Sequence, residues 1–160
     1  MASLSDLPLK HRIFLRMYRY RRVDWTPGAV LSRPLSAARV AAITSAGYYL
    51  PDQPPFDDAI RGGDSSFRVI PDGSTLDYLR IAQRSEAFDR KGIEADKNLA
   101  LPLDRLHELV EANVIGSVAP RHVSLMGSIT APGRLVAETA PALVAMLRQD
   151  EVHAVLLTPV

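Results

Sequence analysis

The sequence has no cysteine among its 160 residues, and this absence removes several chemistries together. Without a thiol, the chain as given forms no disulfide, no thiolate metal site and no thiol nucleophile. Its four histidines are scattered and show no metal-ligand spacing: His11, His107, His122 and His153. We therefore expect no metal site, and nothing in the sequence supports a flavin or another cofactor.

A strong charge of either sign and a long apolar run are also lacking. The net charge of +1 gives no general attraction to nucleic acid or to an anionic membrane. No apolar run approaches the ~18–20 residues of a membrane span, and the start MASLSDLPLK does not resemble a signal peptide. Hydrophobic residues make up 47% of the chain, enough for the core of one domain. We expect a cytoplasmic, single-domain protein with no nucleic-acid or membrane partner.

The N-terminal part, residues 1–34, is expected to form a basic amphipathic helix and a connector. A helix is predicted over residues 7–23, because apolar side chains recur one turn apart at Leu9, Ile13 and Met17. Its other positions carry Lys10, Arg12, Arg16, Arg19, Arg21 and Arg22. Two interpretations stay open: the apolar stripe docks the helix on the rest of the protein, or the basic face binds RNA or a membrane surface. Prolines and a glycine make residues 24–34 a connector.

Residues 35–160 are predicted to form one α/β domain. Short apolar runs indicate strands at 38–44, 67–70, 122–126 and 152–157. Helical periodicity indicates helices at 103–112 and 133–149, and a further helix is expected at 75–83. In the helix at 133–149 the apolar positions one turn apart are Leu135, Val136, Ala140, Leu143, Val144 and Leu147. This order predicts an α/β fold, a mainly parallel sheet with flanking helices in the Rossmann or flavodoxin-like three-layer manner, preceded by the basic helix.

Ligand sites in such sheets lie in the loops at the carboxyl ends of the strands. This rule points to residues 44–47, to residues 127–130 and to whatever follows Pro159 and Val160. In the second loop, Ser128 or Thr130 can cap the next helix, and the free N–H groups of its first turn can seat a carboxylate or phosphate. An ordinary capped helix with water at its end explains the same residues.

His122 and Ser124 are predicted to share one face of their strand. They can therefore present an imidazole and a hydroxyl to one ligand, with His122 as a candidate general acid or base. The alternative is that a neighbouring backbone group satisfies the imidazole. No carboxylate completes a Ser/His/Asp set and no nucleophile-elbow pattern is present, so the sequence does not favour a hydrolase.

The segment GGDSSFR at 62–68 places an acid, two hydroxyls and a guanidinium in a flexible loop. Arg68 can hold a carboxylate through two parallel hydrogen bonds, with Asp64 beside it. The same residues can equally form a turn with an internal Asp–Arg pair. The sequence leaves both interpretations open.

Several segments taken in order and spacing resemble one known family: GGDSSFRVIP (62–71), SEAFD (85–89), ADKN (95–98), LPLDRLHELV (101–110), IGSVAPRHVSLMGSI (115–129) and HAVLLTPV (153–160). From about residue 38 onward the chain resembles the short forms of selenoprotein B of the glycine/betaine/sarcosine/D-proline reductases. Val123 and Leu125 stand where that family is expected to carry aromatic residues, and Asn113 stands where glycine is usual. Asn tolerates the same left-handed backbone.

The resemblance implies an oxidoreductase that reductively cleaves a small amine-bearing carboxylate. It places a redox-active selenocysteine or cysteine just past the last strand, next after Val160, and it implies other reductase subunits as partners; a homo-oligomer is also open. We therefore expect the domain to be incomplete at its C-terminus, with a UGA codon read as a stop. The alternative is a true stop that leaves a degenerate or regulatory remnant. As written, the chain is expected to be inactive.

On this interpretation the substrate-binding residues are Arg68, Asp64, Ser124, Gly127, Ser128 and Thr130. His122 lines the same pocket, and the residue after Val160 attacks the substrate. The alternative from another class is a non-catalytic binding or regulatory module that uses the basic N-terminal helix.

Overall fold

The computed structural model describes residues 8–17, 28–85 and 90–160, which fall into two compact units, 1–30 and 31–160. The first unit contains α1 (Leu9–Met17). This confirms the central part of the helix predicted at 7–23; residues 7 and 18–23 lie outside the described ranges. No helix in the described part of the chain is long and apolar enough to cross a membrane.

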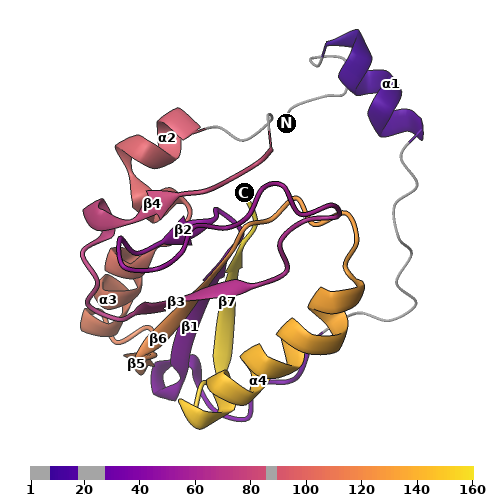
Figure 1. Cartoon of the computed structure of the whole chain (residues 1–160). Helices are drawn as coiled ribbons and strands as arrows, with labels where there is room; N and C mark the ends of the chain where they lie inside the picture. The colour runs from indigo at the N-terminus through magenta and orange to yellow at the C-terminus, as the bar shows by residue number, and fades with distance from the viewer. Residues whose placement is uncertain (1–7, 18–27, 86–89) are drawn as a thin grey trace. The chain divides into compact units, whose positions relative to one another are not determined.

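The second unit is built on a mainly parallel sheet, as the sequence predicts (Figure 1). Its central strand β1 (Arg39–Thr44) pairs in parallel with β5 (Ser117–Val118), β6 (Arg121–Leu125) and β7 (Ala154–Thr158). The strand β3 (Phe67–Pro71) joins the outer side of β6 in the antiparallel direction. The four strands expected from apolar runs are therefore confirmed to within two residues at either end.

The hydrogen bonds of the β1 backbone show which strands lie on each side of β1. The carbonyls of Ala38 and Val40 accept hydrogen bonds from the segment of β5, whereas the carbonyl of Arg39 accepts from His153 beside β7. Since alternate residues of a strand bond to opposite sides, β5 and β6 follow one side of β1 and β7 follows the other. The carboxyl ends of β1, β6 and β7 consequently lie at one edge of the sheet.

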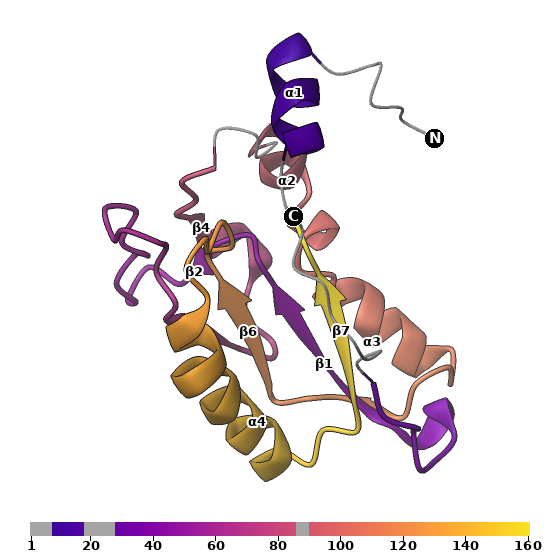
Figure 2. The ribbon, with the colours of Figure 1, turned by 90° about the vertical axis from the view of Figure 1, so that its right-hand side faces the viewer.

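Helices cover both faces of this sheet (Figure 2). On one face, α3 (Leu103–Glu111) buries Leu103 and Leu106 in a cluster with residues of β1 and β3. On the other face, α4 (Ala140–Gln149) buries Leu143 and Met146 against Val123 of β6. The short helices α2 (Arg90–Ala95), η2 (Leu35–Ala37) and η4 (Lys97–Leu99) complete the connections. The helices predicted at 103–112 and 133–149 are confirmed, and the unit has the three layers of an α/β fold.

The helix that ends in α4 has a wider turn than the sequence pattern implies. Its residues Leu135–Thr139 (η5) are π-helical, and Pro141 follows within the next turn. Proline cannot donate the regular helical hydrogen bond, and a π turn is one way in which a helix accommodates such a break. Val136 and Val144 are exposed by 59 and 45%, and Ala140 is exposed as well, so the expected apolar stripe is wrong at these three positions.

The helix expected at 75–83 is also wrong. The segment forms a single 3₁₀ turn, η3 (Leu76–Tyr78), followed by β4 (Arg80–Ile81), which pairs in the antiparallel direction with β2 (Tyr48–Tyr49). Leu79 is buried and Ile81 packs against the same cluster, so alternate residues face the core as in a strand. Burial on a pleated surface outweighs the weak helical preference of this segment.

Candidate functional site

The two loops that follow β1 and β6 are joined at the carboxyl edge of the sheet. The N–H of Gly47 donates to the carbonyl of Leu125 at 2.8 Å. The side-chain amide of Gln83 donates to the carbonyls of Met126 and, at 3.1 Å, Ser45. Gly127 has φ 66, and a Cβ there would lie 2.9 Å from the Ser45 carbonyl oxygen. Gln83 and these close backbone contacts therefore close the crevice between β1 and β6.

The backbone that follows β7 is held at the same edge by Ser45. The Ser45 Oγ accepts a hydrogen bond from the N–H of Val160 at 3.0 Å and donates to its carbonyl at 3.2 Å. Beside this contact lies a cavity of about 230 Å³ lined by Ile43, Thr44, Ser45, Leu125, Leu157, Thr158 and Pro159. The chain thus leaves β7 next to an apolar hollow, among the loops where α/β sheets bind their ligands.

The loop 60–66 packs against the segment that links β6 to the helix of η5 and α4. The carbonyl of Gly62 accepts from the N–H groups of Thr130 at 2.8 Å and Ala131 at 3.0 Å. A Cβ on Gly63 would lie 2.9 Å from the Ile129 Cα, so this approach needs glycine. The loops at 62–68 and 127–130, which the sequence indicates separately, therefore lie against each other. The N–H groups of Thr130 and Ala131 are used in this contact.

Neither Ser128 nor Thr130 caps the following helix within the described residues, since its start carries no side-chain cap. The capping expected from the sequence is wrong, because Ser128 adopts a left-handed backbone with φ 48 and the Thr130 N–H turns to Gly62. The helical hydrogen bond from Val136 to the Pro132 carbonyl leaves the N–H groups of residues 133–135 without a helical partner. Binding of a carboxylate by the loop 127–130 and the start of this helix stays a prediction.

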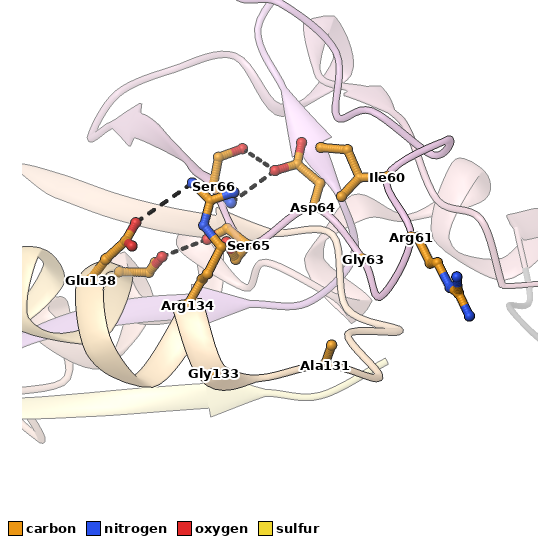
Figure 3. Close-up of a pocket in the computed structure, with 11 residues that line it drawn as sticks. Ile60, Arg61, Gly63, Asp64, Ser65, Ser66, Ala131, Gly133, Arg134 and Glu138 are labelled. Atoms are coloured by element: carbon orange, nitrogen blue, oxygen red, sulfur yellow. Dashed lines mark hydrogen bonds and ion pairs between the residues drawn. The ribbon is translucent and has the colours of Figure 1, made fainter.

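A cavity of about 550 Å³ lies between these two segments (Figure 3). Its wall from the loop includes Asp64, Ser65 and Ser66, and its wall from the helix includes Arg134 and Glu138. Of the six residues expected to bind substrate, Asp64 alone lines this cavity. Ser128 and Thr130 lie in the adjoining segment, whereas Ser124 is buried in the sheet.

Asp64 and Arg68 organise their loop. The Asp64 carboxylate accepts from the N–H of Asp57 at 3.0 Å, and from the N–H and hydroxyl of Ser66 at 2.9 and 2.6 Å. Burial raises the pKa of this carboxyl, but the hydrogen bonds outweigh it, and the pKa of Asp64 lies below its usual value. Asp64 is linked to Arg68 only through the Ser66 hydroxyl, whose Oγ accepts a hydrogen bond from the Arg68 Nη1 at 2.9 Å.

The Arg68 guanidinium is largely committed to the backbone. It donates to the carbonyls of Pro54 at 2.7 Å and Pro55 at 2.9 Å, and it lies 4.2 Å from the centre of the Phe56 ring. With these partners it fixes the loop 54–68 and has no free pair of donors for a substrate. A grip of Arg68 on a carboxylate stays a prediction that this geometry does not favour.

His122 and Ser124 lie fully buried on one face of β6, as the sequence predicts. The His122 Nδ1 accepts the N–H of Ala42 at 3.0 Å. The neutral ring therefore carries its proton on Nε2, which lies 3.5 Å from the Asp72 Oδ1. An Nε2 with a proton has no lone pair for a metal ion or for proton abstraction.

Burial lowers the pKa of His122, although Asp72 opposes the shift. The backbone contact expected as the alternative is present, and an acid or base role stays a prediction. Ser124, next to Thr44 in the β1–β6 register, has an Oγ with no hydrogen-bond partner among the described residues.

Sequence reasoning missed Gln83 and did not single out Ser45 within its loop. Both act on carbonyl or amide groups that are distant in sequence, 43 residues for Gln83 and Met126, and 115 for Ser45 and Val160. A single glutamine or serine carries no sequence signal for such contacts.

A mainly parallel sheet with helices on both faces places this unit in the α/β class of domains, in which ligand sites lie at the carboxyl edge of the sheet. The particular family is identified by sequence: residues 9–160 match the model of the glycine/sarcosine/betaine reductase selenoprotein B family, and the chain belongs to this family. The resemblance stated from the motifs is thereby confirmed.

Two curated relatives are subunits of reductases. The chain is 30% identical over 134 residues to the D-proline reductase subunit gamma of Acetoanaerobium sticklandii, covering 84% of this chain and 52% of that protein. It is 29% identical over 138 residues to the sarcosine reductase complex component B subunit beta of Peptoclostridium acidaminophilum, covering 84% of this chain and 31% of that protein. The chain thus spans about half of one relative and about a third of the other. No solved structure matches it.

Proposed function

We propose that this chain is part of a reductase-complex subunit that cleaves a small amine-bearing carboxylate with a selenocysteine or cysteine next after Val160. The selenolate or thiolate attacks the carbon that bears the ammonium group; a carbon–selenium or carbon–sulfur bond forms, and the nitrogen leaves as the neutral amine with the bonding pair of the broken carbon–nitrogen bond. One thiol of a dithiol then attacks the selenium or sulfur, and the carbon leaves with its bonding pair and takes up a proton to give the deaminated carboxylate. The second thiol releases the selenolate or thiolate, and the dithiol becomes a disulfide. The other reductase subunits are proposed as partners, and the cytoplasmic location expected from the sequence stays a prediction.

The observation that carries the proposal is the contact of Ser45 with Val160. Both backbone groups of Val160 are bound to one side chain of the loop after β1, at 3.0 and 3.2 Å. A residue that follows Val160 would start from a fixed backbone beside the cavity of about 230 Å³. Fixed placement of a nucleophile is a large part of catalysis, because it removes the entropy of bringing the reactants together.

The codon after position 160 tests the identity of the redox residue. We expect UGA or a cysteine codon in frame, continuing into coding sequence, and we expect mass spectrometry of the natural protein to show selenium or the added thiol. A selenolate is ionised at neutral pH, whereas an ordinary cysteine has a pKa of about 8.5. UAA, UAG or a UGA followed by noncoding sequence would contradict the proposal.

Ser45→Ala tests the placement of that residue in the extended subunit. Because Ser45 acts as a positioning residue, we expect kcat to fall about tenfold with KM little changed. Ser45→Thr keeps the hydroxyl and should restore most of the activity. Ser36→Ala, at an exposed position of η2, is the matched control. An unchanged kcat in the Ser45→Ala variant would remove the main structural support.

A non-catalytic binding module remains the second candidate, and α1 provides the observation that favours it. Its apolar side chains Leu9, Ile13 and Met17 recur one turn apart, and the helix also carries the basic Lys10, Arg12 and Arg16. Deletion of residues 1–22 distinguishes the candidates. Loss of partner binding with the second unit still folded would favour the module, and retained binding would count against it.

A further inference from the structure

The strand β7 has an outer edge that no other strand in the described part of the chain occupies. Its one partner there is β1. The N–H of Ser45 donates to the Thr158 carbonyl at 3.3 Å, so alternation within the strand directs the backbone groups of Leu156 and Thr158 to β1. Those of Val155 and Leu157 point outward. An edge strand with free N–H and C=O groups is a template for pairing with a further strand.

The side chains of Val155 and Leu157 lie on the face of the sheet that α4 covers elsewhere. They are paired in register with Ala41 and Ile43 of β1, and paired residues of neighbouring strands place their side chains on the same face. Ile43 packs in the cluster that α4 forms with β6, which identifies this face. Val155 and Leu157 nevertheless remain exposed by 39 and 66%. In Figure 2, α4 lies on the β6 side of the sheet and does not reach β7.

The side of α4 that faces β7 is apolar as well. Leu143 points to the sheet, and Val144 follows it by ~100° around the helix. Because α4 runs from the carboxyl edge of the sheet back to the opposite edge, this rotation turns Val144 toward β7, and its side chain is 45% exposed. Val144, Val155 and Leu157 therefore border one apolar strip, which we call the β7 strip. The cavity of about 230 Å³ lies at its carboxyl end and shares Leu157.

The hand of parallel crossovers determines which face a helix that follows β7 would cover. From β6 the chain passes through α4 and enters β7 on the far side of β1. Crossovers between parallel strands are right-handed in about 98% of cases. A further strand at the outer edge of β7 would continue in the same direction across the sheet. Its helix would therefore lie on the same face as α4, over the β7 strip.

We infer that the segment of the subunit that follows Val160 forms a helix on the β7 strip and then a strand parallel to β7 at its outer edge. The inference rests on the proposed function, which takes the chain to continue past Val160. The length of the curated relatives supports this occupant. The chain spans about half of one and about a third of the other, whereas a unit of helix and strand needs only ~30 residues. The tether also favours this segment over a separate chain, because its effective concentration at the strip is high.

Hydrogen exchange of the extended subunit, resolved to single residues, tests the inference. The amides of Leu156 and Thr158 face β1 and provide the internal reference. We expect the amides of Val155 and Leu157 to exchange about as slowly, at least about 100-fold more slowly than in a free edge strand. Free exchange of Val155 and Leu157 beside a protected Leu156 would overturn the inference. Protection that is lost on dilution would assign the edge to a second copy, and protection that requires another subunit would assign it to that subunit. Either result would also overturn it.

A pair of valine variants tests the helix on the β7 strip. Val155 and Val114 are exposed by 39 and 44%, so Val114→Gln is a matched control for Val155→Gln. If a helix covers Val155, its substitution should lower the urea midpoint of the extended subunit by about 1 M, with little change for Val114→Gln. Equal midpoints would contradict a covering helix.

The same measurements separate this inference from the proposed function. A protected β7 edge in an extended subunit that has neither selenocysteine nor cysteine after Val160 would count against the proposed function alone. Turnover by a subunit in which Val155 and Leu157 exchange freely would count against this inference alone.

Discussion

Replacing Gly47 with alanine is expected to destabilise the protein by about 4 kcal/mol or more, a loss near the upper end for single substitutions. Gly47 has φ +72, where an L side chain is strained, and a Cβ there would lie 2.2 Å from the Ala82 carbonyl oxygen. The obstacle is backbone on both sides: the Gly47 carbonyl accepts from the Ala82 N–H, and its N–H donates to Leu125. Neither strand end can therefore move away without losing hydrogen bonds.

Two glycines provide controls that separate the causes of this effect. Gly73 has φ +80 with nothing within 4 Å, so Gly73→Ala measures backbone strain alone, about 1 kcal/mol. Gly133 has neither a positive φ nor a close neighbour, and Gly133→Ala should be neutral or slightly stabilising. Urea unfolding of the three variants gives the comparison. An equal loss of unfolding free energy in Gly47→Ala and Gly73→Ala would mean that the backbone at Ala82 moves to make room for the Cβ at little cost.

The strands and main helices follow from the sequence because their signals are local. The apolar run at 38–44 and the stripe of Leu103 and Leu106 need no knowledge of distant residues. The short strands β2 and β4 have two residues each, too few for a periodic pattern. Leu79, which directly precedes β4, is buried, and this burial favours the strand pairing. Pro141 was a readable signal for the wide helical turn, but its consequence for the buried stripe depends on the register of the π segment.

The candidate site is less predictable for the same physical reason. The rule that ligands bind at the carboxyl ends of parallel strands selects the loops at 44–47 and 127–130, which the structure joins through Gln83. The rule does not say which polar side chains already form hydrogen bonds within the protein. Arg68 is bound to proline carbonyls, and His122 uses its Nδ1 for a backbone amide while its buried Nε2 has no hydrogen-bond partner among the described residues.

The free energy of unfolding is expected to fall as the pH drops below about 6.5, with His122 as a main cause. Burial holds the folded-state pKa of this imidazole below the unfolded value of about 6.5. Above that pH the ring is neutral in both states and contributes no pH dependence. Between the two pKa values the unfolded state binds the extra proton, so stability is lost as the pH falls, by about 1.4 kcal/mol for each unit between them.

The hydrogen bonds of His122 explain why its protonation is harmful. Its Nδ1 accepts the Ala42 N–H, so a proton added at Nδ1 would replace a bond between the buried strands with two facing donors. Asp72 near Nε2 opposes the shift, and His107, 2.9 Å from the same Asp72 oxygen, adds to it when charged. His122→Asn retains an acceptor in place of Nδ1 without a titrating group. We expect this variant to be less stable at pH 8 but to lose less stability between pH 6.5 and 5.

His107→Gln is the control, because it removes an exposed imidazole from Asp72 and leaves the bond to Ala42 intact. Urea unfolding at pH 8, 7, 6 and 5 gives the three slopes. A slope of His122→Asn equal to that of the wild type, with His107→Gln flattened instead, would assign the acid sensitivity to the surface pair. The opposite result would show that a buried ring between β6 and β1 limits the stability of the sheet on which the candidate site is built.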